Sequence, residues 1–260
     1  MIDTHCHLDD PVYEADFDTV LAAQQAAGVE RILVPGVDAD NAQAVLDVCR
    51  RSHGYLLPAI GLHPENIHAD WQDQLDRLHQ LLTIPQAPYI AIGEIGLDYH
   101  ADLTYKEEQK QAFITQLEWA QEQDLPVMIH CREATQDCLD LLRHTMLKKP
   151  LHGVMHCFSG SNEVARQIVD MGLYLGIGGV ITFKNCLLRE HLGNIPIERI
   201  VLETDAPYMT PVPYRGKRNE SRFIQYVIEA LSTVYGLPTD EIDRITNQNA
   251  RCLFRLKDEK

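Results

Sequence analysis

The segment from residue 126 to residue 158, PVMIHCREATQDCLDLLRHTMLKKPLHGVMHCF, decides the fold. It opens with a short apolar run, Pro126–Cys131, continues through a helical pattern over Glu133–Leu147, and closes with a second apolar run, Gly153–Phe158. Strands of this length separated by a helical segment are typical of a βαβ unit, in which the two strands are parallel. The segment therefore predicts a parallel sheet covered by helices.

The same alternation extends along the chain in both directions. Strand-like runs are predicted at Ile2–His7, Arg31–Gly36, Leu56–Gly61, Tyr89–Glu94, Pro126–Cys131, Gly153–Phe158, Leu173–Gly179 and Arg199–Asp205. Helical periodicity is clearest at Glu14–Ala27, Ala39–Arg51, Trp71–Leu82, Tyr105–Gln123, Glu133–Leu147 and Ser161–Met171, and weaker at Leu187–Gly193. Eight strands in about 205 residues favour closure into a barrel over an open sheet. We expect an α/β protein, a single-domain (β/α)8 TIM barrel spanning residues 1–260.

A proline-rich loop, Pro207–Pro213, follows the last predicted strand. A helix is expected from about Glu220 to Tyr235, with Asn219 or Ser221 as its N-cap, because short polar side chains can accept from the free N–H groups of the first turn. An extra C-terminal helix, Thr239–Phe254, should pack on the barrel exterior.

Composition limits the classes of protein and of partner. No apolar run approaches the ~18 residues of a membrane span, and no signal peptide is expected at the N-terminus. The seven cysteines form no CxxC pair, which indicates reduced thiols and a cytoplasmic location. The formal net charge of −15 should repel nucleic-acid phosphates unless the site supplies local positive charge.

Histidines and carboxylates gather where the predicted strands end. His5 and His7 are two residues apart in the first strand, so their side chains point to one face. Four other strands contribute one residue each at the same rim: Glu94, His130, His156 and Asp205. Burying this many polar and ionisable side chains costs free energy unless each has a hydrogen-bonding or charged partner. Six ligands exceed what one catalytic zinc ion with an open position uses, so two metal ions with Glu94 as a bridge are predicted.

Residues beside the predicted ligands have other expected roles. Strand parity sends the three cysteines next to the ligands, Cys6, Cys131 and Cys157, to the opposite face as small core residues. Glu203 shares the parity of Asp205 and is expected behind the ligands, where it would orient them or a water molecule, or occasionally ligate a metal directly. His63, after the third strand, is either a phosphate or substrate contact or a simple loop histidine.

Positive charge is concentrated locally despite the acidic total. The predicted substrate-binding residues are His63, Arg132, Arg215, Lys217 and Arg218, with Lys184 as a further cation at this rim. Guanidinium groups suit bidentate contact with phosphate, whereas the alternative is a solvated loop whose cations offset nearby carboxylates.

These motifs resemble the TatD family of metal-dependent deoxyribonucleases, within the amidohydrolase-type superfamily. The matching segments are IDTHCHL from Ile2, GLHP from Gly61, IGEIGLDY from Ile92, PVMIHCREA from Pro126, HCFSG from His156, LETDAPY from Leu202, RGKRNE from Arg215 and NARCLF from Asn249. They appear in the family's order over essentially the whole chain.

The resemblance implies a TIM barrel, two divalent metal ions per subunit (Zn, Mn or Mg) and hydrolysis of DNA phosphodiester bonds, often from a 3′ end. It implies that His5, His7, Glu94 and Asp205 hold one metal and that Glu94, His130 and His156 hold the second. His63, Arg132 and the Arg215–Arg218 segment would face the substrate phosphate.

We therefore expect a divalent-metal-dependent deoxyribonuclease, a 3′-5′ exonuclease acting on single-stranded or terminal DNA. The metals would lower the pKa of a bound water to give hydroxide near neutral pH. Asp205 and Glu94 are the predicted catalytic carboxylates, with Asp205 orienting the nucleophile and accepting its proton. The expected partner is DNA or a nucleotide phosphodiester, with no membrane, and the protein is expected to be a monomer. The alternative is hydrolysis of a small-molecule ester, amide or lactone by the same binuclear site.

Overall fold

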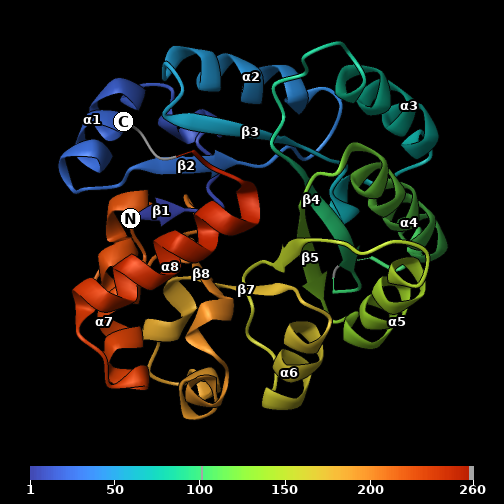
Figure 1. Cartoon of the computed structure of the whole chain (residues 1–260). Coiled ribbons are helices and arrows are strands. Elements are labelled where there is room, and N and C mark those ends of the chain that lie inside the picture. Colours follow the sequence, from blue (N-terminus) through green and yellow to red (C-terminus); the bar gives the residue numbers. More distant parts are fainter. Residues whose placement is uncertain (101, 258–260) are drawn as a thin grey trace. The chain divides into compact units, whose positions relative to one another are not determined.

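Eight parallel strands follow one another in chain order and alternate with helices, which is the arrangement of a (β/α)8 barrel with additional C-terminal helices (Figure 1). The structure, a computed structural model, describes residues 1–100 and 102–257. The chain forms two compact units. The terminal half comprises Met1–Val34 and His156–Lys260, and the central half comprises Pro35–Met155.

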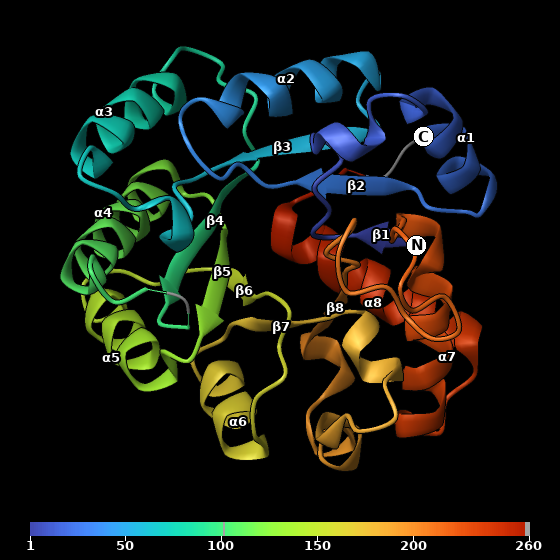
Figure 2. The same cartoon turned by 180° about the vertical axis from the view of Figure 1, so that it is seen from behind.

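The terminal half contains the first two and the last two strands. Its strands are β1 Ile2–Asp3, β2 Arg31–Val34, β7 Tyr174–Ile177 and β8 Ile200–Leu202. Its helices are α1 Phe17–Ala26, α6 Asn162–Asp170, α7 Ile224–Tyr235 and α8 Thr239–Phe254. β1 pairs with β2, and β7 pairs with β8. α7 and α8 lie side by side, as the reverse view shows (Figure 2).

The first strand of the terminal half also joins the last. The backbone N–H of Thr4 donates to Leu202 O at 2.9 Å, and that of His7 donates to Ala206 O at 2.8 Å. An isolated parallel bridge links Cys6 with Ala206. Residues from the two ends of the sequence are thereby held next to each other at the carboxyl ends of β1 and β8.

The central half contains the other four strands. They are β3 Leu56–Ile60, β4 Ala91–Asp98, β5 Val127–Arg132 and β6 Gly153–Met155. Its helices are α2 Asn41–Arg51, α3 Trp71–Leu82, α4 Lys106–Gln123 and α5 Thr135–Met146. All eight residues of β4 are buried, as expected for a parallel strand covered on both faces.

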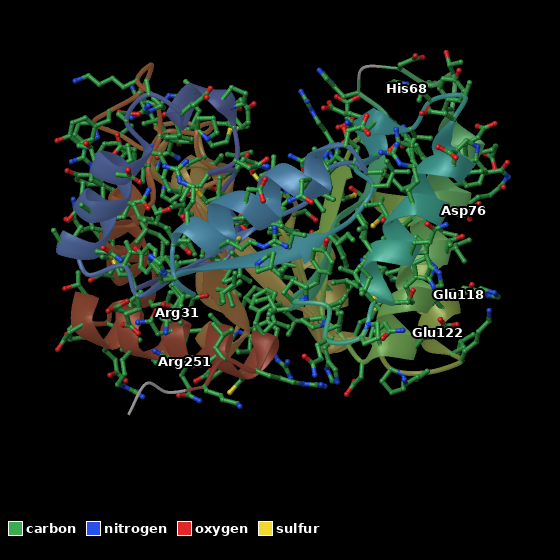
Figure 3. The ribbon with its side chains drawn as sticks, turned by 90° about the horizontal axis from the view of Figure 1, so that it is seen from above. Arg31, His68, Asp76, Glu118, Glu122 and Arg251 are labelled. Carbon is green, nitrogen blue, oxygen red and sulfur yellow. The ribbon has the colours of Figure 1, made fainter. Side chains whose placement is uncertain are left out.

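The outer surfaces of α3 and α4 carry acidic side chains, including Asp76, Glu118 and Glu122 (Figure 3). The same helices bury apolar side chains such as Leu78 and Leu117. This amphipathic pattern separates the charged surface from the core.

The prediction that Asn219 or Ser221 caps the helix after the proline-rich loop is wrong. A short 3-10 helix, Ser221–Phe223, precedes α7, and neither element has a side-chain N-cap. Asn219 is buried and instead donates to the carbonyl oxygens of Thr204 and Tyr208, at 2.8 and 2.6 Å. Its tertiary hydrogen bonds therefore replace the local cap. The weak helical segment Leu187–Gly193 is likewise two short 3-10 helices, Leu187–Glu190 and Leu192–Asn194.

Candidate metal centre

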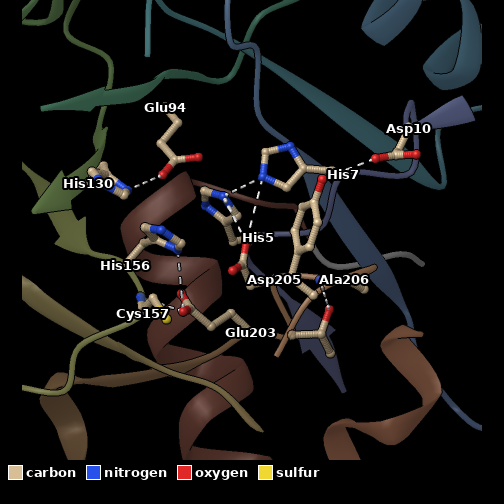
Figure 4. A network of polar contacts seen from close by, with 12 residues as sticks. His5, His7, Asp10, Glu94, His130, His156, Cys157, Glu203, Asp205 and Ala206 are labelled. Carbon is tan, nitrogen blue, oxygen red and sulfur yellow. Dashed lines mark hydrogen bonds and ion pairs between the residues drawn. The ribbon is translucent and has the colours of Figure 1, made fainter. Parts of the chain in front are cut away.

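Two histidines from the end of β1 meet an aspartate from the end of β8 (Figure 4). The Nε2 atoms of His5 and His7 are 3.3 Å apart, and Asp205 Oδ1 lies 3.9 and 3.7 Å from them. The backbone N–H of Asp205 donates to His5 O at 2.9 Å, so the pairing of the two chain segments sets this approach. The prediction that His5 and His7 share one face is confirmed by the convergence of their Nε2 atoms.

His156 completes the donor group of the terminal half. Its ring stacks on that of His5, with centroids 3.9 Å apart and an angle of 16° between the planes. Donor atoms of His5, His156 and Asp205 all lie within 4.8 Å of one another. Three converging donors from two imidazoles and a carboxylate are a suitable ligand set for zinc, manganese or iron.

The spacing of the imidazoles also fits a metal ion. Two nitrogens bound to one tetrahedral zinc ion lie about 3.4 Å apart, because each Zn–N bond is about 2.0–2.1 Å long. The 3.3 Å between His5 Nε2 and His7 Nε2 matches this spacing. The donors can thus bind a cation with little rearrangement.

A buried acid, Asp3, supports this group from β1. Its side chain accepts hydrogen bonds from the backbone N–H of His5 at 3.2 Å and from the N–H and hydroxyl of Thr204 at 3.0 and 2.6 Å. Burial raises the pKa of Asp3 to about 7, against the lowering effect of its hydrogen bonds from Thr204 and the His5 N–H. Sequence reasoning missed this residue, although Asp3 shares the parity of His5 and His7 and lies one step deeper in the strand.

Glu203 lies one step deeper than Asp205. It is fully buried, and its Oε1 accepts from the backbone N–H of Cys157 at 2.5 Å and lies 3.5 Å from His156 Nδ1. Gly176 makes room for it, because a Cβ there would be 2.1 Å from Glu203 Oε2. These contacts suit a carboxylate that holds the His156–Cys157 turn from behind.

In the central half, His130 lies between two carboxylates. Its Nδ1 is 2.9 Å from Glu94 Oε1, and its Nε2 is 2.8 Å from Asp98 Oδ2. Burial opposes ionisation of Asp98, but hydrogen bonds from His130 and the His100 N–H outweigh burial and keep the pKa of Asp98 below its ordinary value. Glu94 and Asp98 have the same parity in β4, a signal that could have identified Asp98 from the sequence.

A glycine allows the strands of this half to approach each other. Gly96, between the two carboxylates, has a φ of +149°, and a Cβ there would be 1.9 Å from His130 O. Only glycine combines this backbone conformation with so close a neighbour.

His63, predicted as a phosphate or substrate contact or as a loop histidine, lies beside the predicted ligands Glu94 and His130. Its Nε2 is 3.3 Å from Glu94 Oε1, and donor atoms of His63, Glu94 and His130 lie within 4.8 Å of one another. The backbone N–H of Glu65 donates to His63 Nδ1 at 3.1 Å. In the neutral ring the proton must then be on Nε2, so His63 is better suited to donate a hydrogen bond than to ligate a metal.

The predicted phosphate-binding cations differ in their surroundings. Arg132, Arg215 and Lys217 are exposed, and the Arg215 guanidinium lies 3.8 Å from the centre of the Phe183 ring. Arg218 instead makes two hydrogen bonds to Asp16, at 2.9 and 2.7 Å, and a third to Val12 O. These contacts favour a structural role for Arg218.

The cysteines beside the ligands lie outside the donor groups. Cys6 is fully buried, whereas Cys131 and Cys157 are only half-buried. Within residues 1–100 and 102–257, each potential metal-binding group consists of histidine, glutamate and aspartate alone.

Comparisons with known proteins identify a family and several relatives. A family described as TatD related DNase matches residues 2–255. The uncharacterized metal-dependent hydrolase YabD of Bacillus subtilis is 38% identical over 257 residues, covering 98% of this chain and 99% of that protein. The 3′-5′ ssDNA/RNA exonuclease TatD of Yersinia pseudotuberculosis is 33% identical, covering 98% of this chain and 100% of the relative.

A solved structure shares the fold. The crystal structure of YjjV, a TatD homologue from Escherichia coli K12, superposes with a TM-score of 0.91 and 34% identity, covering 99% of this chain and 98% of that one. In the described part of this chain, no helix is long and apolar enough to cross a membrane. The match over residues 2–255, together with the histidine and carboxylate groups, shows that the chain belongs to the TatD family of metal-dependent hydrolases.

Proposed function

We propose that the protein is a metal-dependent phosphodiesterase that removes nucleotides from the 3′ end of single-stranded or terminal DNA. The observation that carries this proposal is the pair of histidine–carboxylate donor groups at strand ends, one in each half of the chain. The exonuclease relative supports DNA as the substrate.

The two donor groups are proposed to form one binuclear centre in a single barrel domain. In a (β/α)8 barrel the carboxyl ends of all strands meet at one face, where the active site lies. His5, His7, Glu94 and Asp205 would hold one metal, and Glu94, His130 and His156 the other. Their mixed nitrogen and oxygen donors are compatible with zinc or manganese, whereas magnesium prefers oxygen-rich sites.

When bound, the divalent ions would supply Lewis-acid stabilisation of the phosphoryl group and make a water more acidic. Asp205 is the proposed proton acceptor, because its carboxylate lies beside the His5 and His7 ligands and is half-buried. Its proton would pass to the leaving 3′ oxygen. His63 would donate from Nε2 to a non-bridging phosphoryl oxygen, since its Nδ1 is occupied by the Glu65 N–H.

Substrate phosphates would be bound by Arg132, Arg215 and Lys217, whose cationic groups are exposed. The net charge of −15 opposes an extended duplex, because long-range attraction requires a basic surface. A short single-stranded end needs only cations close to the reacting phosphate. The acidic net charge of the protein therefore favours cleavage at a strand end over cleavage within an extended duplex.

The proposal is tested with a 5′-labelled single-stranded oligonucleotide, a small phosphodiester and a carboxylate ester, each with added metal or with chelator. We expect a ladder of fragments shortened one nucleotide at a time from the 3′ end, and no cleavage with chelator. The control variant is Leu147→Ala, whose side chain is 84% exposed beyond the end of α5. Hydrolysis of the ester alone would overturn the proposal.

The second candidate is hydrolysis of a small-molecule ester, amide or lactone by the same centre. The strongly acidic composition favours it, because a small substrate needs no basic surface. The ester arm of the same assay distinguishes the two functions.

We further propose that the protein acts as a cytoplasmic monomer. All seven cysteines are free thiols, which suits a reducing compartment. Light scattering should then give a mass near 29.5 kDa in solution.

A further inference from the structure

The loop after β8 presents an exposed aromatic side chain next to the ligands of the terminal half. Tyr208 is 55% exposed, and its ring centroid is 6.3 Å from that of His7 in an edge-to-face arrangement. Its backbone N–H donates to Asp205 O at 2.8 Å. The tyrosine is therefore tied directly to the proposed proton acceptor.

The position of Tyr208 is fixed from several sides. Buried Asn219 donates to Tyr208 O at 2.6 Å, and the phenol oxygen lies 3.3 Å from Asp10 Oδ2. A large apolar ring that is both exposed and held in place contributes little to the core. Such a ring is suited to contact a ligand.

Two cations follow Tyr208 in the same loop, and a second aromatic ring lies against one of them. The loop continues to Arg215 and Lys217, and Arg215 stacks on Phe183. Phe183 is brought to the loop because the backbone N–H of Val212 donates to Thr182 Oγ1 at 2.9 Å. Aromatic rings combined with exposed cations are the features with which proteins bind single-stranded nucleic acid.

We infer that Tyr208 stacks against a nucleobase flanking the phosphodiester that is cleaved, so that it selects a base-bearing strand end. This inference rests on the proposed nuclease function. Stacking on a tyrosine does not distinguish one base from another, because every base has a π face. The protein should therefore prefer strands with bases over abasic strands, with little preference among bases.

The test compares two single strands under metal-loaded conditions. One carries normal nucleotides throughout, and the other carries tetrahydrofuran spacers without bases at its last two positions. We expect wild-type protein to favour the normal strand by about 10- to 100-fold in kcat/KM. Tyr208→Leu should lose most of this preference, whereas Tyr208→Phe and the control Leu147→Ala should keep it. A Tyr208→Leu variant that retains the wild-type ratio overturns the inference.

A binding measurement gives a readout independent of turnover. Asp205→Asn protein is mixed with a strand whose last base is 2-aminopurine, whose fluorescence falls when it stacks. The Asp205→Asn protein, which keeps Tyr208, should quench the fluorescence. The double variant Asp205→Asn/Tyr208→Leu should not. Equal quenching by both proteins contradicts the inference. If metal-loaded wild-type protein cleaves neither strand, the nuclease proposal itself fails.

Discussion

The two halves of the chain hold their metal-binding side chains by different means. In the central half, Glu94 and His130 lie within the strands β4 and β5, which pair over several residues, with a shift in register between Ile92 and Ile95 at Glu94. In the terminal half, β1 and β8 have only two and three residues, and their ligands lie beyond them. There, individual hydrogen bonds and the buried carboxylates Asp3 and Glu203 fix the ligands.

The length of the strands determines how each half positions its ligands. Pairing between β4 and β5 positions the backbone that carries His130, and Asp98 orients the His130 ring. Where the strands end early, buried polar side chains hold the ligand segments, and the ionisation of Asp3 becomes linked to folding. Asp98 should thus act on metal binding through the His130 ring, whereas Asp3 and Glu203 should act mainly on the backbone and on folding.

The largest effect is expected for Asp205→Asn in the terminal half. Asparagine preserves the shape of the side chain but cannot accept the proton, so kcat should fall by about 10³-fold or more while most of the metal remains bound. Activity and metal content measured on the same sample check this. Nuclease activity near the wild-type rate would remove Asp205 from the mechanism.

A pair of substitutions compares the supporting carboxylates directly. Asp98→Asn should weaken metal binding by about 10- to 100-fold, because Asp98 hydrogen-bonds the His130 ring at 2.8 Å. Glu203→Gln should weaken it less, since Glu203 lies 3.5 Å from His156 Nδ1 and chiefly holds the Cys157 N–H. Competition with a chelating dye measures both affinities. Equal losses of metal affinity in the two variants would show that the supporting carboxylates of the two halves contribute equally to metal binding.

A smaller effect concerns folding of the metal-free protein. The folded-state pKa of Asp3, about 7, lies above the ordinary value for an aspartate, which is about 3.9. Its contribution to stability is therefore present below pH 4 and is lost as pH rises to about 7, by up to about 4 kcal/mol. Asp3→Asn should not show this loss. Urea unfolding of both proteins between pH 4 and pH 8 checks it, and parallel stability curves would contradict the assignment.

Periodicity predicted regular elements well and supporting contacts poorly. The ranges Trp71–Leu82 and Thr239–Phe254 match α3 and α8, because amphipathic patterns define their buried faces. The first strand ends at Asp3 and not at His7, since the segment continues only through single hydrogen bonds and a bridge.

The ligand side chains could be predicted because parity and strand ends are local properties of the sequence. The tautomer of His63 could not, because it depends on the Glu65 N–H in the folded loop. The role of Asn219 also depends on distant partners, Thr204 and Tyr208, which no local cap pattern reveals.

The proposed binuclear centre requires two bound metal ions for phosphodiester hydrolysis. Protein stripped with chelator is titrated with manganese or zinc, and bound metal and exonuclease rate are measured together at each step. We expect no cleavage without metal and a rate that reaches its plateau at about two ions per chain. Cleavage at the full rate by metal-free protein would contradict it.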